Sequence, residues 1–446
     1  MRTTRNGLLV WIFAMCVMTR ALAQEEVFGV GDAEDFLQAP SMQPTTKPTT
    51  APSKEKFVRV KNPPGAIDKL VQFDSAGTWS EGTLFNANVI PNAPARIELG
   101  FKETGYPRSG SWTSPESKAT FPINELIASF NPTCPPGTGV TLEVRVEQNK
   151  TWSPWIFMQS WGKCLTPPDR DLKWDGGYAD IDTIVLDPSK PATKYQARIG
   201  LVDFGFDAAP GAARPSVRRL SVCYSGVVTD SKRREKIQRD INDPTTRPTS
   251  PTQWARDLKV PFRGQGDFKN PKVLWGMICS PTSTSMVLEY FGVNRPTVEN
   301  ALAIYDPQYD LFGNWGRSVS RAGELGLNAY LTRFRNWDQV HEKIAQGTPV
   351  IASIRFKPGT VKGFLYEETA GHLLVIRGFK ENGDLIVNDP ASRDKGNGVI
   401  YKPEEMAKAW FDNGGVGYVI EKPKRSITDV PAVTEGPTTA PTANAR

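Results

Sequence analysis

Apolar and polar residues alternate along three segments in the first half of the chain: Val140–Val146, Tyr195–Val202 and Val217–Tyr224. A period of two is typical of β-strands that bury one face. Glycine and proline fall between these segments, and no long run with the helical period of 3.6 occurs. The pattern therefore predicts an all-β domain over residues 57–226, with a β-sandwich as the simplest architecture.

The second half of the chain mixes both periods. Apolar positions at helical spacing predict helices over Pro281–Phe291, Trp337–Gln346 and Lys402–Asp412. Short apolar runs predict strands, with a turn at Gly383, over Thr348–Arg355, His372–Phe379, Asp384–Asn388 and Gly417–Ile420. Helices followed by an antiparallel sheet indicate an α+β domain over residues 254–424.

Runs rich in proline and threonine mark the joints between these regions, at Gln43–Lys54, Asp243–Gln253 and Pro437–Arg446. Such runs favour an extended, solvated chain and cannot form a packed core. We therefore expect a Pro/Thr-rich disordered segment over 24–56, the sandwich over 57–226, a linker over 227–253, the α+β domain over 254–424 and a disordered tail over 425–446.

The start of the chain has the pattern of an export signal. Arg2 and Arg5 precede an apolar core, Leu8–Met18, which is too short to span a bilayer comfortably. An A-x-A site at Ala21–Ala23 predicts cleavage before Gln24, so residues 1–23 are the expected signal peptide. A retained anchor is the alternative. We expect a mature protein that is secreted, periplasmic or at the cell surface, with no stable membrane insertion after cleavage.

Composition narrows the classes of function. The 446 residues are 39% hydrophobic and 23% charged, with a formal net charge of +6. No Lys/Arg block is dense enough to predict nucleic-acid binding, since Ser231–Lys236 is a short solvated run. The sequence contains no H-E-x-x-H, C-x-x-C or P-loop motif and has two histidines. We therefore expect neither a metal nor another cofactor.

Export also changes how the cysteines are interpreted, because an oxidising compartment permits disulfides. Cys16 would leave with the signal, and four cysteines would remain: Cys134, Cys164, Cys223 and Cys279. If Cys279 is kept free for chemistry, one pair among the other three and one buried thiol is the natural expectation. The sequence alone does not choose the pair.

Two features of the first domain allow a binding function or a structural one. Six tryptophans could stack on sugars or fill the core of the sandwich, and filling the core is the commoner use of large aromatic residues: Trp79, Trp112, Trp152, Trp155, Trp161 and Trp174. The acidic stretch Asp175–Asp182 could supply oxygen ligands to calcium or form a solvated loop that runs into a strand.

Cys279 is the candidate nucleophile of the second domain. It stands one or two residues before the first turn of the predicted helix, where unpaired amides and the helix dipole favour a thiolate. His341 is predicted on a solvated helix face, whereas His372 opens a core strand, so His372 is the candidate base. Asp389 ends the next strand, and antiparallel pairing of the two strands would bring it beside His372 to orient the imidazole.

These motifs carry a resemblance to a known family. The sequence "CSPTS" before an apolar helix, then "GHLLVIRGF" and "IVNDP", resembles papain-like cysteine peptidases, and among them the double-glycine leader peptidases that process bacteriocin precursors. The resemblance covers residues 260–420. Ser280 departs from the commonest motif, which reads Cys-Gly-Pro. No membrane span or ATP-binding segment follows the domain, so we expect a stand-alone form rather than a transporter-coupled one.

The resemblance implies a role for each matched residue. Cys279 would be the nucleophile, His372 the general base and acid, Asp389 the orienting carboxylate, and Gln265 a donor to the oxyanion. The expected function is a secreted peptidase that cleaves amide bonds of a peptide or protein through an acyl-enzyme. Three alternatives remain open: an inactive peptide-binding domain, transfer of the acyl group to an amine, or a glycan or cell-surface adhesin that acts through the sandwich.

Overall fold

The computed structural model describes residues 61–100, 108–164, 172–205, 213–241, 248 and 250–423. The expected signal peptide, the disordered segment that follows it, the tail and part of the Pro/Thr-rich linker lie outside the described residues. Among the described residues, no helix has both the length and the apolar character that a membrane span requires.

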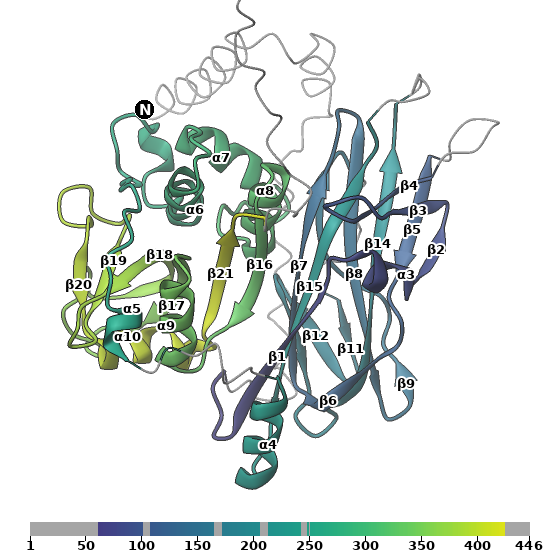
Figure 1. Ribbon diagram of the computed structural model, residues 1–446, viewed down its shortest axis with the longest axis horizontal. Helices are drawn as coiled ribbons and strands as arrows, with labels where there is room; N and C mark the ends of the chain where they lie inside the picture. The colour runs from purple at the N-terminus through teal and green to yellow at the C-terminus, as the bar shows by residue number, and fades with distance from the viewer. Residues whose placement is uncertain are drawn as a thin grey trace, which may run out of the picture. The chain divides into compact units, whose positions relative to one another are not determined.

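The first half of the chain forms two antiparallel sheets that enclose one hydrophobic core, as the alternating segments predict (Figure 1). The eight-stranded sheet contains β1 (Ala66–Phe73), β3 (Ala87–Ile90), β4 (Arg96–Leu99), β7 (Glu125–Thr133), β11 (Lys173–Trp174), β12 (Gly177–Asp180), β13 (Thr183–Leu186) and β15 (Ser216–Val227). The seven-stranded sheet contains β2 (Thr83–Phe85), β5 (Ser109–Thr113), β6 (Ser117–Ile123), β8 (Thr138–Gln148), β9 (Thr151–Trp152), β10 (Ile156–Gly162) and β14 (Ala192–Asp203).

The tryptophans of this sandwich serve mainly as packing. Trp79, on the short helix α3 (Ala76–Ser80), and Trp112 are fully buried, with their rings edge to face at 4.9 Å. Trp161 is also buried. Arg145 lies over the rings of Trp152 and Trp155. Sugar stacking therefore gains no support from these five rings.

The second half is the α+β domain that the mixed periods predict. One six-stranded antiparallel sheet runs in the order β16-β21-β17-β18-β19-β20. Its strands are β16 (Asn328–Arg333), β17 (Val350–Phe356), β18 (Thr369–Phe379), β19 (Leu385–Asn388), β20 (Val399–Tyr401) and β21 (Val416–Glu421). Gly383, with a φ of +85°, forms the turn between β18 and β19. The N-terminal domain and the α+β domain are the multidomain architecture expected from the sequence.

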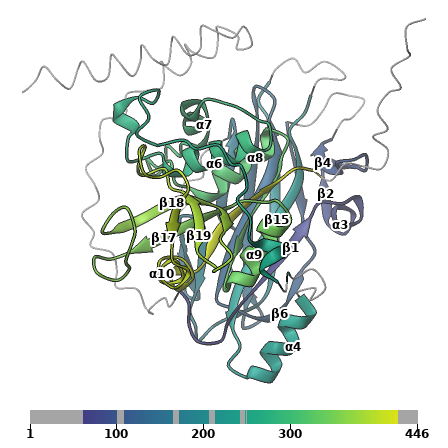
Figure 2. The same cartoon turned by 60° about the vertical axis from the view of Figure 1, so that its left-hand side comes forward.

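Helices cover both faces of this sheet. Figures 1 and 2 show α6, α7 and α8 above it and α9 and α10 below it. The helices of the domain are α5 (Pro251–Trp254), α6 (Cys279–Tyr290), α7 (Thr297–Ile304), α8 (Trp315–Glu324), α9 (Trp337–Ala345) and α10 (Pro403–Ala409), with 3-10 turns at Lys272–Leu274 and Phe411–Asn413. Helix α6 packs on β18, and this contact positions the candidate site.

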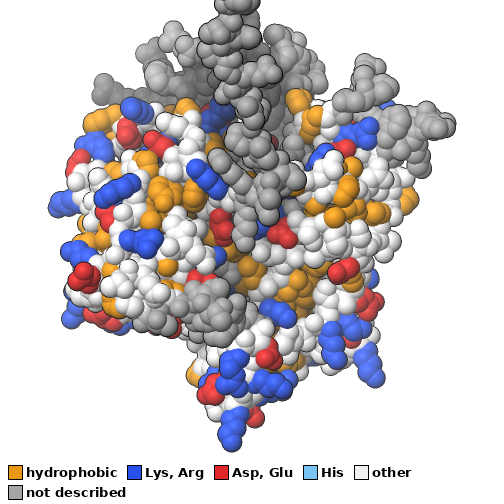
Figure 3. Space-filling model, in the orientation of Figure 1, with side chains coloured by type: hydrophobic (Ala, Val, Ile, Leu, Met, Phe, Trp, Pro, Cys, Tyr) orange, Lys and Arg blue, Asp and Glu red, His pale blue; other side chains and the backbone are white. Residues whose placement is uncertain are grey.

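The segment expected to be a linker contains a helix that the sequence analysis did not predict. Helix α4 (Ser231–Ile241) carries the basic run, and its buried side chain Ile237 joins the core of the sandwich. Blue side chains gather at the lower tip of Figure 3, where Figure 1 places α4. The basic residues therefore lie on the solvated faces of a short surface helix.

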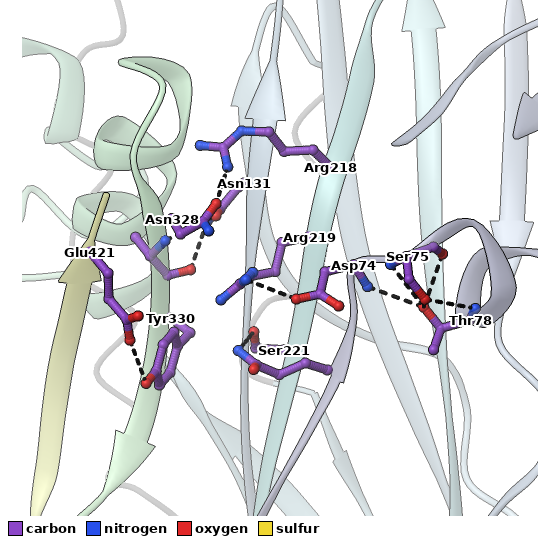
Figure 4. Close-up of polar contacts among 12 residues, drawn as sticks. Asp74, Ser75, Thr78, Asn131, Arg218, Arg219, Ser221, Asn328, Tyr330 and Glu421 are labelled. Carbon is purple, nitrogen blue, oxygen red and sulfur yellow. Dashed lines mark hydrogen bonds and ion pairs between the residues drawn. The ribbon is translucent and has the colours of Figure 1, made fainter. Parts of the chain in front are cut away.

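The two regions share an extensive polar interface, which no pattern in the sequence indicates. The side-chain amide of Asn131, on β7, donates to the backbone carbonyl of Ala329 at 2.7 Å and accepts from the backbone amide of Ala329 at 3.0 Å. It therefore pairs with Ala329 as the backbone of a neighbouring strand would. Arg218 of β15 donates to the Asn328 side chain at 2.6 Å (Figure 4). Both regions belong to one compact unit.

Helix α8 is the element that enters this interface most deeply. Its Gly323 lies so close to β7 that an added Cβ would come within 2.7 Å of the Asn131 Cα. Asp182 of the acidic stretch accepts from the Trp315 amide at 3.0 Å and so caps the first turn of α8. Asp182 therefore has a structural contact, whereas Asp175 at the start of the stretch is 79% exposed and precedes β12, as expected for a solvated loop that runs into a strand. No group of potential metal ligands occurs within the described ranges.

The buried ion pair between Arg333 and Glu125 gives a stability prediction. The two side chains are 2% and 9% exposed, 2.7 Å apart, and join β16 to β7. Replacing Arg333 with alanine leaves the Glu125 carboxylate buried without its partner. We expect Arg333→Ala to lower the free energy of unfolding by about 3–5 kcal/mol. Arg393→Ala, which breaks a surface pair with Asp394, should lower it by about 1 kcal/mol or less. Urea unfolding followed by tryptophan fluorescence measures both, and equal losses would contradict this ranking.

Candidate active site

Cys279 is the first residue of α6, and Ile278 occupies the N-cap position without a side-chain cap. The amides of the first turn therefore have no helical acceptor and point toward the end of the helix where the thiol lies. The backbone amides of Leu373 and Ser280 help to lower the pKa of the Cys279 thiol. This environment favours the thiolate over the thiol.

Helix α6 is held firmly against the strand that carries the histidine. Every side chain from Ser280 to Leu288 is buried. The Ser283 hydroxyl donates to the carbonyl of Leu373 at 2.9 Å, one residue beyond His372. Asn300 of α7 donates to Ser285 at 2.8 Å from the other side of the helix. These hydrogen bonds fix the position of Cys279 relative to β18.

Strands β18 and β19 pair with Val375 opposite Asn388, so the antiparallel pairing expected from the sequence is confirmed. This register brings His372, the first buried residue of β18, to the end of β19. His372 Nε2 and Asp389 Oδ1 lie 2.8 Å apart. The same imidazole lines one cavity with the Cys279 thiol and lowers the pKa of that thiol. The structure thus brings Cys279, His372 and Asp389 together in one chain of contacts.

Asp389 is fully buried, and its carboxylate is heavily hydrogen-bonded. Besides His372, it accepts from the Tyr401 hydroxyl at 2.8 Å, the Tyr366 hydroxyl at 3.1 Å and the Ala391 amide at 3.0 Å. Burial alone would raise its pKa, but the charge and hydrogen bond of His372 outweigh burial and hold that pKa below its ordinary value. The carboxylate therefore stays ionised and keeps the ring of His372 in one orientation.

The electrostatics of Cys279 and His372 favour an ion pair between the two side chains. Burial raises the pKa of Cys279, but the hydrogen bond and charge of His372 and the two backbone amides bring it below its ordinary value. Burial lowers the pKa of an imidazole, yet Asp389 and Cys279 raise the pKa of His372 to about 10. A thiolate beside an imidazolium is the protonation state that these shifts favour at neutral pH.

A cavity of about 290 Å³ opens above the thiol and is lined by Cys279, His372, Gln265, Tyr366 and neighbouring loop residues. The loop of Gln265 is held beside Asp389, because the Gln265 amide donates to the Pro390 carbonyl at 2.9 Å. The Gln265 side-chain oxygen is buried and has no hydrogen-bond partner. Rotation of the carboxamide by 180° would place its NH₂ group at that position. The polar end of Gln265 is therefore available to a bound substrate.

Ser280, which replaces the glycine of the commonest family motif, does not narrow this cavity. Its side chain is fully buried, and its hydroxyl lies 2.9 Å from that of Ser318 on α8 and 3.1 Å from that of Tyr418 on β21. The serine therefore has polar partners on the side of α6 that faces the sandwich. It ties the first turn of α6 to α8.

His341 is placed differently from the sequence expectation of a solvated helix face, which was wrong. Its ring stacks on Trp254 with centroids 3.9 Å apart and meets Phe379 edge on at 4.5 Å. Burial lowers the pKa of His341, so its neutral form is favoured. The histidine is a packing residue between α9 and β18.

Sequence reasoning missed three residues that shape the site: Ser283, Tyr366 and Tyr401. Tyr401 sits on β20, and its hydroxyl reaches Asp389 across the end of β19. Tyr366 lies in the loop before β18, where its ring meets His372 edge on at 5.2 Å. No periodicity or motif marks either tyrosine. Only the register of the last two strands and the path of the loop bring them to the carboxylate.

Comparisons with known proteins give two family matches. Residues 257–418 match the Peptidase_C39 like family, and residues 69–225 match the Peptidase C39 N-terminal domain. The comparison with curated proteins gave no match. These results confirm the resemblance to double-glycine peptidases that the motifs around Cys279 and His372 indicated.

Two solved structures are also similar to parts of the chain. One is a double glycine motif protease from an AMS/PCAT transporter in complex with the leader peptide, at 21% identity and a TM-score of 0.26 over 37% of this chain and 94% of that one. The other is the enzymatically active domain of bacteriophage CBA120 tailspike protein 4, at 10% identity and a TM-score of 0.15 over 38% of this chain and 20% of that one. Such TM-scores do not establish a shared fold.

The two family matches coincide with the two regions of the fold, the α+β domain and the sandwich. The first covers α6, β18 and β19, which carry Cys279, His372 and Asp389, and the second covers the two sheets of the sandwich. The chain therefore contains a region similar to the C39-like peptidase family, preceded by a region similar to the C39 N-terminal domain.

Proposed function

We propose that the protein is an exported cysteine peptidase in which Cys279, His372 and Asp389 form a catalytic triad. The observation that carries the proposal is the 2.8 Å contact of His372 with the buried Asp389 carboxylate, in a cavity wall that His372 shares with the Cys279 thiol. A nucleophile, a base and an orienting group in contact are what acyl transfer from an amide requires. The C39-like family match supports the same class of reaction.

The first half of the proposed reaction forms an acyl-enzyme. The Cys279 thiolate attacks the carbonyl carbon of the scissile amide, and the new C–S bond pushes an electron pair onto the oxygen. His372 enters this step protonated, since its pKa is raised to about 10. It gives its proton to the leaving nitrogen as the C–N bond breaks. Asp389 keeps the imidazole aligned throughout.

The second half releases the acid. His372, now neutral, removes a proton from a water molecule that attacks the thioester carbonyl. Collapse of this intermediate breaks the C–S bond, and the thiolate and imidazolium are restored. A primary amine in place of water would give acyl transfer instead, so the products distinguish these two outcomes.

Gln265 is proposed to stabilise the oxyanion of both tetrahedral intermediates. One donor would be the Cys279 amide at the start of α6, and the second would be the Gln265 carboxamide, which shares the cavity with the thiol. A neutral amide suits this position, because a positive side chain would perturb the neighbouring ion pair. The buried, unpartnered end of the Gln265 side chain supports this role.

Gln265→Ala should lower kcat for peptide hydrolysis by about a hundredfold, because one of two donors to the developing charge is lost. Alkylation of Cys279 should change little, since that reaction forms no oxyanion. Gln346→Ala, at an exposed helix end, is the matched control and should leave kcat unchanged. Steady-state kinetics combined with iodoacetamide labelling measures both effects. An unchanged kcat in Gln265→Ala would show that Gln265 is not the second donor to the oxyanion.

The surroundings of the cavity favour an extended peptide with apolar side chains. Phe268, Val273 and Met277, in the loop that leads to Cys279, are 75%, 59% and 46% exposed. Large apolar side chains exposed together often mark a binding surface. Gly276, between the last two, lines the cavity itself. We therefore propose that the apolar side chains of this loop contact a peptide bound at the thiol.

Peptide cleavage can be tested before the natural substrate is known. The full chain is incubated with a library of peptides from a digested proteome, and mass spectrometry identifies new termini. The proposal predicts cleavage products that are absent with Cys279→Ala protein. Products in which a primary amine is attached to the new carboxyl end would assign the transferase alternative. No new termini from a folded wild-type chain would favour the inactive peptide-binding alternative.

A further inference from the structure

Cys134 and Cys164 converge on one backbone carbonyl at the edge of the sandwich. The thiol of Cys134 lies 3.5 Å from the Trp161 carbonyl oxygen, and the thiol of Cys164 lies 3.3 Å from the same atom. The two sulfurs therefore lie no farther apart than the sum of these two distances. Cys134 follows β7 and Cys164 follows β10, so residues distant in sequence meet here.

Two glycines leave the space that these thiols occupy. Gly139 of β8 pairs with Gly162 of β10. A Cβ added to Gly139 would come within 2.4 Å of the Cys164 sulfur, and one added to Gly162 would come within 3.0 Å of the Cys134 sulfur. Gly162 also has a φ of +73°, which other residues rarely adopt. Glycine at both positions therefore leaves room for the two thiols.

We propose that Cys134 and Cys164 form a disulfide when the protein folds under oxidising conditions, and that Cys223 and Cys279 remain thiols. In the structure all four are unpaired. A disulfide with the standard S–S distance of about 2.05 Å requires both side chains to rotate away from the Trp161 carbonyl. Cys223 is buried between the sandwich and β16, with Thr332 as its neighbour, and Cys279 lies at the candidate active site.

The chemistry needs an oxidant of the disulfide class, such as oxidised glutathione. One cysteine thiolate attacks a sulfur of that disulfide, which forms a mixed disulfide and releases one thiol. The second thiolate attacks the bound cysteine sulfur, forms the Cys134–Cys164 bond and releases the second thiol. Two electrons pass to the oxidant, and the two thiol protons end on the released thiols. Burial raises the pKa of both thiols, that of Cys164 to about 11, so exchange is fastest before the site closes during folding.

The bond would fasten the part of the sandwich that receives α8. It would close a loop that contains β8, β9 and β10, including Trp161. The Trp161 indole donates to Glu324 of α8 at 2.9 Å, and Arg317 of the same helix lies over its ring. Helix α8 also contacts Ser280, which is next to Cys279. The disulfide would therefore stabilise the region that holds α8 against the active site, and the Cys279 thiol would remain free.

Peptide mapping tests the proposal directly. The full chain is produced once in an oxidising compartment and once in a reducing cytosol, alkylated in denaturant without reduction, and digested. The oxidised sample should contain the Cys134 peptide joined to the Cys164 peptide, two hydrogens lighter than the separate peptides, and Cys223 and Cys279 should be alkylated. Alkylated Cys134 and Cys164 in the oxidised sample, or a link from either to Cys223, would overturn the proposal.

Stability provides the second measurement. Reduction of the oxidised wild-type chain should lower its Tm by several degrees, because a loop of this length is released in the unfolded state. Cys134→Ser and Cys164→Ser should each remove that sensitivity to reductant, whereas Cys223→Ser should retain it. If the reductant shifts the Tm of Cys134→Ser as much as that of the wild type, the stabilising bond lies elsewhere and the proposal fails.

Discussion

Replacing Cys279 with alanine should reduce kcat/KM for peptide hydrolysis by at least about a thousandfold. The thiolate is the atom that would form the covalent intermediate, and no other described side chain in the cavity wall carries a comparable nucleophile. Alanine keeps the helix start, because the residue has no side-chain capping role. The domain should therefore fold normally while the reaction is lost.

The control separates loss of the nucleophile from loss of a thiol in general. Cys164→Ala, measured in reducing buffer, removes a half-buried cysteine outside the site and should retain nearly full kcat/KM. Circular dichroism and the Tm establish that both variants are folded. Equal turnover by Cys279→Ala and the wild type would reject the cysteine peptidase mechanism.

His372→Ala should cause a second loss of about a thousandfold or more, and it should also change the chemistry of the thiol. The imidazole both transfers protons and holds the pKa of Cys279 down. Without it, burial remains as the largest influence on that pKa and raises it. Iodoacetamide alkylation of Cys279 at pH 7 should therefore slow by about tenfold or more, because less thiolate is present.

The pH profile follows from the directions of the two shifts. Activity of the wild type should rise as pH passes the lowered pKa of Cys279 and fall as His372 loses its proton near pH 10. His341→Ala, which alters the other histidine of the chain, should keep this bell shape because His341 packs on Trp254 away from the cavity. An alkylation profile for His372→Ala that matches the wild type would mean that His372 does not act on the thiol.

The elements that carry the triad could be predicted because their signals are local. The apolar face of α6 ends at Gly292, and the run from His372 to Phe379 is bounded by Gly371 and the turn at Gly383. Strand pairing across a tight turn has few possible registers, so the meeting of His372 and Asp389 follows from strand length. The alternation in β8 and β14 predicts the sandwich for the same reason.

The supporting contacts could not be predicted because they depend on packing between distant segments. Asn131 meets Ala329 across almost 200 residues of chain, and nothing in either local pattern selects the partner. Helix α8 has serine and glycine on buried positions, which hides it from a search for apolar periodicity. The hydroxyls of Tyr366 and Tyr401 reach Asp389 only because a loop and an edge strand converge there.

Site-resolved labelling by a thiol-reactive electrophile tests the central claim most directly. At pH 6 an ordinary cysteine, with a pKa of about 8.5, is well under 1% thiolate. Wild-type protein treated briefly with iodoacetamide at this pH should be labelled at Cys279 at least about ten times faster than at Cys134, Cys164 or Cys223, and His372→Ala should remove that preference. Labelling of Cys279 at the rate of an ordinary thiol, unchanged in His372→Ala, would contradict an activated nucleophile at the start of α6.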